Sequence, residues 1–262
     1  MNVPSSNAPR ISGNHSLRSR SQALVSEAQP QAKRPSVVMR KFEVASLQPD
    51  GSVRQAEHIG PAMPLFEAAF SAFAHGALVT TTMGPVAVED LEPGMKLITR
   101  DHGSQRLLWV GKMKIVPKFA ESTAHDARMT RIMSDSFGFT RPERDLTAGP
   151  GARMLKAGAV MSDQDPVLVP VNQLSDGMSV IDIVPPSPVD VYHLCLPRHA
   201  TIMVNGLDME SFHPGEGFQR NMGQNMLSLF LSLFPHIDTP EDFGSLNYER
   251  RPLVASNGLE VA

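Results

Sequence analysis

Residues 70–99 read FSAFAHGALVTTTMGPVAVEDLEPGMKLIT and carry the pattern that decides the fold. Two short runs of strand-favouring residues, ALVTT and PVAV, flank Met83-Gly84, where glycine permits the positive φ of a tight turn. Pro93 and Gly94 supply a second turn signal, because proline fixes its own φ and glycine frees the next one. A third run of the same kind follows. The stretch therefore predicts a compact β meander.

This stretch also resembles the opening of a Hint domain, the fold shared by hedgehog autoprocessing domains and inteins. The likeness is carried by FAHGALVTT from Phe73 and by GPVAVEDLEPG from Gly84. In that family, an active domain begins with a cysteine just before such a phenylalanine, and here that position is Ala72. The resemblance implies an all-β fold: a Hint-like horseshoe of short, curved, mostly antiparallel strands.

A second group of residues resembles the closing motif of inteins and hedgehog domains. It consists of VYHL at 191–194, then His199, then an Asn-Gly pair. Inteins end in His-Asn, and the asparagine side chain cyclises to release the downstream segment. The equivalent positions here are Glu210 and Ser211, and the chain continues beyond them. Residues 210–215 also resemble the close of a group of bacterial Hint-domain proteins.

The middle of the chain departs from the family at its chemical positions. Residues 145–155 read DLTAGPGARML, where the Hint family carries a Thr/Ser-x-x-His element followed by an apolar strand. The family's histidine polarises the first peptide bond and assists the acyl shift. That element falls here on Gly149 to Ala152, so its hydrogen-bonding and proton-transfer groups are missing.

These replacements bear on whether the chain can process itself. Self-processing in the Hint family needs a nucleophile, and the nucleophile must be activated by a base within hydrogen-bond reach. Ala72 has no nucleophilic atom, Ala152 has no titratable group, and only His199 remains. Losing one member of a catalytic unit removes most of its rate. We therefore expect a degenerate Hint-domain protein without enzymatic activity, in which His199 is structural and the domain is a binding or scaffold module for an unidentified protein.

Two alternatives remain open. Ser71 precedes Ala72 and could be a shifted nucleophile assisted by His199, with residues 70–71 as the scissile bond. A shift of one residue in an extended segment turns the side chain to the opposite face, which disfavours this hypothesis. The other alternative is a protein of type I secretion or surface assembly, although the sequence shows no repeat and no glycine-rich calcium motif.

The composition excludes several classes of protein. The chain has 262 residues, 41% of them apolar, which is typical of a globular protein. Its net charge of -3 argues against nucleic-acid binding, which needs concentrated Lys and Arg. Cys195 is the single cysteine, so no intrachain disulfide can form. No histidine pair has metal-ligand spacing with a cysteine, and we expect neither metal nor cofactor.

The location is predicted from two further patterns. The longest apolar run, residues 226–234, is far shorter than the roughly 20 residues that span a bilayer. The first residues contain no apolar segment of the kind found in a classical secretory signal. We therefore expect a cytoplasmic protein without a membrane span, while leaderless export and the oligomeric state stay open.

The chain divides into three parts by composition. Residues 1–37 are rich in Ser, Asn, Gln, Pro and Arg and predict a disordered N-terminal tail. Residues 38–236 should form the Hint-like domain, with the core of the resemblance at 65–215, and 237–262 a C-terminal tail. Apolar side chains at helical spacing predict one C-terminal amphipathic helix at 225–234, ended by a proline. Further strands are predicted at 38–47, 53–59, 106–117, 130–134, 167–171, 179–184, 189–196 and 201–204.

Overall fold

The structure, a computed structural model, describes residues 38–117, 128–156 and 165–251. The predicted N-terminal tail, residues 1–37, lies outside the described residues. Strands dominate what is described, with the short helices α1 (Pro64–Ala68) and α2 (Gln224–Leu231). The strands are β1 (Met39–Leu47), β2 (Val53–Pro61), β3 (Phe73–Ala74), β4 (Leu78–Thr81), β5 (Gly84–Ala87), β6 (Lys96–Thr99), β7 (Gly103–Arg106), β8 (Trp109–Ile115), β9 (Met129–Ile132), β10 (Leu146–Ala148), β11 (Arg153–Lys156), β12 (Val167–Pro170), β13 (Val180–Ile183), β14 (Val189–Cys195), β15 (Thr201–Val204) and β16 (Leu207–Glu210).

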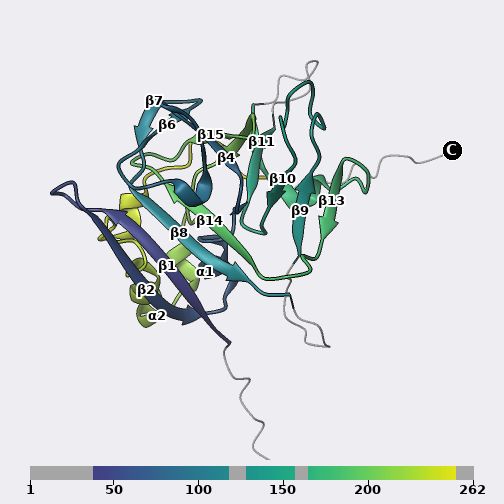
Figure 1. Cartoon of the computed structure of the whole chain (residues 1–262). Coiled ribbons are helices and arrows are strands. Elements are labelled where there is room, and N and C mark those ends of the chain that lie inside the picture. The colour runs from purple at the N-terminus through teal and green to yellow at the C-terminus, as the bar shows by residue number, and fades with distance from the viewer. Residues whose placement is uncertain (1–37, 118–127, 157–164, 252–262) are drawn as a thin grey trace, which may run out of the picture. The chain divides into compact units, whose positions relative to one another are not determined.

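The strands form two sheets, and every pairing between named strands is antiparallel. One sheet has the order β13-β9-β10-β3-β14-β8-β1-β2, and the other has the order β12-β11-β16-β15-β4-β6-β7 with β5 on β4 (Figure 1). The predicted all-β fold class is confirmed. Because β3 pairs with both β10 and β14, the segment before β3 lies between two parts of the chain that are distant in sequence.

The opening stretch forms β4, β5 and β6, but these strands are not arranged as a meander. β4 pairs with β5 along its whole length, and its other edge pairs with β6, where Thr81 faces Leu97. The 3-10 helix Val88–Asp90 and the turn at Gly94, which has a φ of 104°, carry the chain from one edge of β4 to the other. The prediction of a meander is therefore wrong, although its strands and turns are present.

The Asn-Gly pair of the closing motif makes a hairpin that the sequence reading missed. Asn205 and Gly206 have φ values of 47° and 82°, as a tight two-residue hairpin turn requires. They connect β15 to β16 and set Glu210 opposite Thr201. The Asn205 side-chain oxygen accepts the Leu78 N–H at 2.7 Å. The turn thereby fixes the closing hairpin to the opening strands and positions Glu210.

An aromatic cluster holds the C-terminal helix against the sheet that contains β1 and β8. Trp109 is fully buried, its ring is stacked on Phe234 with centroids 4.7 Å apart, and its Nε1–H donates to the Leu233 carbonyl at 2.7 Å. The predicted C-terminal helix is confirmed as α2. No helix within residues 38–117, 128–156 and 165–251 is both long and apolar enough to cross a membrane. The other rings of the cluster are Phe42, Phe66, Phe70, Phe212, Phe230 and Phe243.

Residues 237–251, which the sequence assigned to a C-terminal tail, contact the domain. A 3-10 helix at Pro240–Phe243 buries Phe243 in the aromatic cluster. The Leu168 N–H on β12 donates to the Glu249 carbonyl at 2.8 Å, and the Arg251 N–H donates to the Leu168 carbonyl at 3.0 Å. Residues 249–251 therefore lie beside β12, which pairs with β11.

Candidate functional site

The segment before β3 is held on both sides by backbone hydrogen bonds. The Ala72 N–H donates to the Tyr192 carbonyl on β14 at 2.9 Å, and the Gly149 N–H donates to the Ala72 carbonyl at 2.9 Å. The Gly151 N–H donates to the Ser71 carbonyl at 2.9 Å. Both polar groups of the Ser71–Ala72 peptide bond thus have partners, and both residues are fully buried. This bond is fixed in place, with a methyl group on its downstream residue.

The loop from β10 to β11 reaches this segment because two of its residues lack a side chain. A Cβ at Gly149 would lie 2.2 Å from the Ser71 carbonyl oxygen, and one at Gly151 would lie 2.5 Å from the Ala68 carbonyl oxygen. Such contacts are far shorter than van der Waals separation, so neither position accepts a side chain without a shift of backbone. The backbone of the loop therefore lies so close to the Ser71–Ala72 peptide bond that a side chain at position 149 has no space.

Gly149→Ala is expected to destabilise the domain by about 3 kcal/mol, at the upper end of the usual cost of overpacking, because the added methyl meets a backbone oxygen. Urea unfolding followed by tryptophan fluorescence measures the loss. Gly223→Ala is the matched control, since a Cβ there has nothing within 4 Å and the loss should stay below about 1 kcal/mol. If Gly149→Ala were as stable as the parent chain, the close approach of the loop would be refuted.

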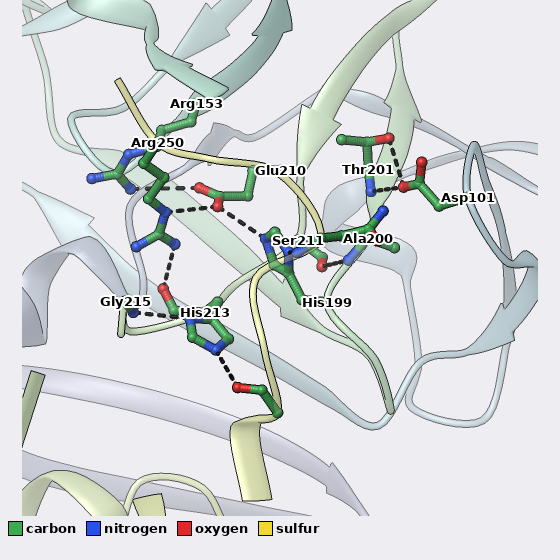
Figure 2. Close-up of polar contacts among 12 residues, drawn as sticks. Asp101, Arg153, His199, Ala200, Thr201, Glu210, Ser211, His213, Gly215 and Arg250 are labelled. Atoms are coloured by element: carbon green, nitrogen blue, oxygen red, sulfur yellow. Dashed lines mark hydrogen bonds and ion pairs between the residues drawn. The ribbon is translucent and has the colours of Figure 1, made fainter. Parts of the chain in front are cut away.

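Glu210, the last residue of β16, is a buried carboxylate at the centre of a charge cluster (Figure 2). Its Oε1 accepts hydrogen bonds from His199 Nε2 at 2.9 Å and from Arg250 Nε at 2.8 Å, and Arg153 Nη1 lies 3.5 Å from its Oε2. Burial opposes ionisation of Glu210, but the His199 hydrogen bond and the charges of Arg250 and Arg153 outweigh it and lower the pKa of Glu210 to about 2. Glu210 is therefore ionised at neutral pH.

Both ring nitrogens of His199 are engaged. The Asn247 N–H donates to His199 Nδ1 at 2.9 Å, so the ring carries its proton on Nε2 and donates it to Glu210. The neighbouring Ser211 hydroxyl oxygen accepts the Ala200 N–H at 3.1 Å. His199 thus joins the Glu210 carboxylate to the Asn247 backbone, and Ser211 holds the backbone beside it.

His213 is engaged in the same way on the other side of the cluster. Its Nε2–H donates to the Gly244 carbonyl at 3.1 Å, and its Nδ1 accepts the Gly215 N–H at 2.9 Å (Figure 2). Burial lowers the pKa of His213 to about 4, so the ring is neutral at pH 7. Arg250 Nη2 donates to the His213 carbonyl at 2.6 Å, which ties the C-terminal segment to this turn.

A cavity of about 540 Å³, named here the Ser71 cavity, opens beside the segment before β3. Its polar lining includes Ser71, Arg153, His193 and Arg250. The His193 Nδ1–H donates to the Ala68 carbonyl at 2.9 Å, and burial lowers the pKa of His193 to about 4. Within the described residues, the Ser71 Oγ and the His193 Nε2 have no hydrogen-bond partner. Two residues of the cavity lining thus each carry a buried polar atom without a partner.

Comparison with known families identifies the fold. The sequence profile of the Hint domain matches residues 71–216. The chain belongs to the Hint domain family. A search of curated proteins found no match to this Hint chain.

Two solved structures are similar to this Hint chain. One is the solution structure of a bacterial intein-like domain from Clostridium thermocellum, at 12% identity and a TM-score of 0.38, covering 54% of this chain and 99% of that one. The other is the crystal structure of a mutant Ssp DnaB mini-intein variant, at 14% identity and a TM-score of 0.33, covering 56% of this chain and 95% of that one.

The predicted site positions of the Hint domain fall into two groups. Ala72 and Ala152 belong to one buried cluster, and Gly149 bonds the backbone of the same segment. His199 and Glu210 form the other group, which meets the first through Arg153, the residue after Ala152. Their assignment as remnants of a processing site stays a prediction.

Sequence reasoning missed several residues of this site. His193, to which the sequence assigned no role beyond the closing motif, lines the Ser71 cavity, whereas His199 lines a different cavity of about 180 Å³. A histidine within the apolar strand β14 was the available signal. Arg250 lay in the predicted C-terminal tail and had no local signal.

The described part of this Hint domain was also searched for metal-ligand clusters and a reactive thiol. Across residues 38–117, 128–156 and 165–251, no group of three or more His, Cys, Asp and Glu residues could hold a metal ion. Cys195 is buried, and burial raises the pKa of its thiol to about 12, so the reactive thiolate is scarce at neutral pH.

Proposed function

We propose that this Hint domain does not cleave or splice its own chain and acts as a binding or scaffold module. One observation carries the proposal: both polar groups of the peptide bond before position 72 are held by backbone hydrogen bonds, but position 72 is alanine. A methyl group cannot attack a carbonyl carbon. The covalent route of the Hint family therefore has no starting atom at this position.

The surroundings of the bond support the same conclusion. Ala152 stands where the family has its polarising histidine, and a side chain at Gly149 would clash with the Ser71 carbonyl oxygen. His199 is the family histidine that remains, and both of its ring nitrogens are hydrogen-bonded, to Glu210 and to the Asn247 backbone. Since members of a catalytic unit depend on one another, His199 alone supports no measurable processing.

The test is the mass of the chain after expression with one tag at each end. The expected product is a single full-length species that keeps both tags and stays intact in thiol and in hydroxylamine. Hydroxylamine is informative because it cuts the ester or thioester that an acyl shift forms. Spontaneous cleavage beside residue 71 or 72 would overturn the proposal.

A second candidate function is autoprocessing through Ser71. The observation that favours it is the unpartnered Ser71 Oγ, which lines the same cavity as the unpartnered His193 Nε2. The Oγ would attack the Phe70 carbonyl carbon, the bond from that carbon to the Ser71 nitrogen would break, and the hydroxyl proton would pass to the released amine. Water would then hydrolyse the ester to a Phe70 carboxylate and the Ser71 hydroxyl.

Ser71→Ala separates the two candidates. If Ser71 is the nucleophile, the parent chain yields a fragment beginning at residue 71 and hydroxylamine leaves a hydroxamate on Phe70, while Ser71→Ala abolishes both. If the domain is inactive, the parent chain and Ser71→Ala each give only their own full-length mass and no fragment, which is the result we expect.

A further inference from the structure

The Ser71 cavity combines two arginines with two residues that each carry an unpartnered polar atom. We propose that it binds an α-substituted carboxylate: a carboxylate group whose α-carbon carries an O–H or N–H donor and an apolar side chain. A free 2-hydroxy acid and the carboxyl terminus of a peptide share this chemistry. The inference rests on the proposed function, because it names what the binding module takes up.

The cavity carries an excess of positive charge. Arg153 and Arg250 line it and share the single carboxylate of Glu210, so two guanidinium groups face one counter-charge. Among the described residues, Arg153 has only the 3.5 Å ion pair with Glu210. Glu67, the carboxylate that lines the cavity, is paired with Arg40 at 2.7 Å. One more carboxylate would balance the charge, and a guanidinium binds it with two parallel hydrogen bonds.

The unpartnered Ser71 Oγ and His193 Nε2 indicate the second group of the ligand, the O–H or N–H donor on its α-carbon. His193 donates through Nδ1, so its Nε2 is a bare acceptor and requires a donor from the ligand. The Ser71 hydroxyl can donate or accept. Both residues are at most 2% exposed, and a buried polar atom without a partner costs free energy. An O–H or N–H beside the carboxylate would satisfy the His193 acceptor while the carboxylate meets Arg153.

The rest of the lining accounts for the apolar side chain. Leu65, Phe212 and Pro214 are apolar residues of the same lining. The volume of about 540 Å³ lies within the range of small-molecule sites, which are mostly apolar with a few placed polar groups. The cavity therefore suits a ligand that combines a carboxylate, an adjacent donor and one apolar side chain.

Isothermal titration of the full chain tests this assignment with N-acetyl-L-phenylalanine and 3-phenyllactate. N-acetyl-L-phenylalaninamide, which lacks the carboxylate, should bind at least about tenfold more weakly, because hydrogen bonds to charged groups are lost. 3-Phenylpropionate, which lacks the donor, should bind about threefold to tenfold more weakly. Arg153→Gln should weaken both acids about tenfold. Arg54→Gln on β2 is the matched control and should leave both affinities unchanged.

The titration tests the ligand class separately from the mass measurement that tests the proposed function. Tighter binding of the acetylated amino acid supports a peptide carboxyl terminus, and tighter binding of phenyllactate supports a free hydroxy acid; both support the ligand class. No saturable binding up to about 10 mM, equal binding of acid and amide, or no effect of Arg153→Gln overturns it. Such a failure with an intact chain would refute the ligand class alone, whereas self-cleavage would refute the proposed function.

Discussion

Glu210→Ala is expected to destabilise the domain by about 3–5 kcal/mol, the usual cost of removing one partner from a buried ion pair. Glu210 is 1% exposed, and its carboxylate is the common partner of His199, Arg250 and Arg153. Without it, two guanidinium groups and a histidine N–H face one another with no counter-charge. The free energy of unfolding in urea, followed by tryptophan fluorescence, measures the loss.

Glu57→Ala provides the control for Glu210→Ala. The Glu57 side chain is 67% exposed and pairs with Lys41 at 2.7 Å on the surface, so its loss should cost less than about 1 kcal/mol. The Glu210 variant should also lose protection of residues 247–251 from trypsin, because Arg250 and Asn247 both depend on the His199–Glu210 pair. Equal and small effects of the two substitutions would show that the charge cluster contributes little to the fold.

Trp109→Ala is expected to cost about 3–5 kcal/mol as well, for reasons of packing rather than charge. The indole is fully buried among the rings of the aromatic cluster, and its removal leaves a cavity. It also leaves the Leu233 carbonyl without its donor, which loosens the end of the C-terminal helix.

The Trp109 measurement needs far-ultraviolet circular dichroism, because this residue is the only tryptophan and the variant has no indole fluorescence. Phe139→Ala is the control, since Phe139 is 90% exposed and its truncation should change stability by less than about 0.5 kcal/mol. A loss below about 1 kcal/mol for Trp109→Ala would mean that the aromatic cluster does not hold the helix.

The strands could be predicted because their signals are local. Alternating and β-branched residues marked β1, β8 and β14 without knowledge of the rest of the chain. The order of strands is not local, and β4 illustrates this. Its central place between β5 and β6 depends on how the 3-10 helix at Val88–Asp90 directs the chain, which no pattern of apolar residues encodes.

The closing hairpin could have been predicted and was not. Asn-Gly between two apolar runs is the strongest short-range signal of a hairpin, and Asn205-Gly206 has that form. The likeness to a family motif drew attention to these residues as part of a site instead. As a result β16, the strand that places Glu210, was not predicted.

Some residues of the candidate site could likewise be predicted from local sequence, and others could not. The alanines at 72 and 152 can be identified from the motifs alone. The Glu210–Arg250 pair cannot, since the two residues are 40 positions apart and the segment around Arg250 has no apolar periodicity. Gly149 reads as a turn residue in sequence, and only its distance from the Ser71 carbonyl shows that it permits a close backbone approach.

The mass of the doubly tagged chain, followed over time in buffer with and without hydroxylamine, tests the central claim most directly. If the domain does not process its own chain, the parent chain and Ser71→Ala each give one species, with the full mass and both tags, at every time point. A fragment that begins at residue 71 or 72, or one that hydroxylamine releases there, would contradict it.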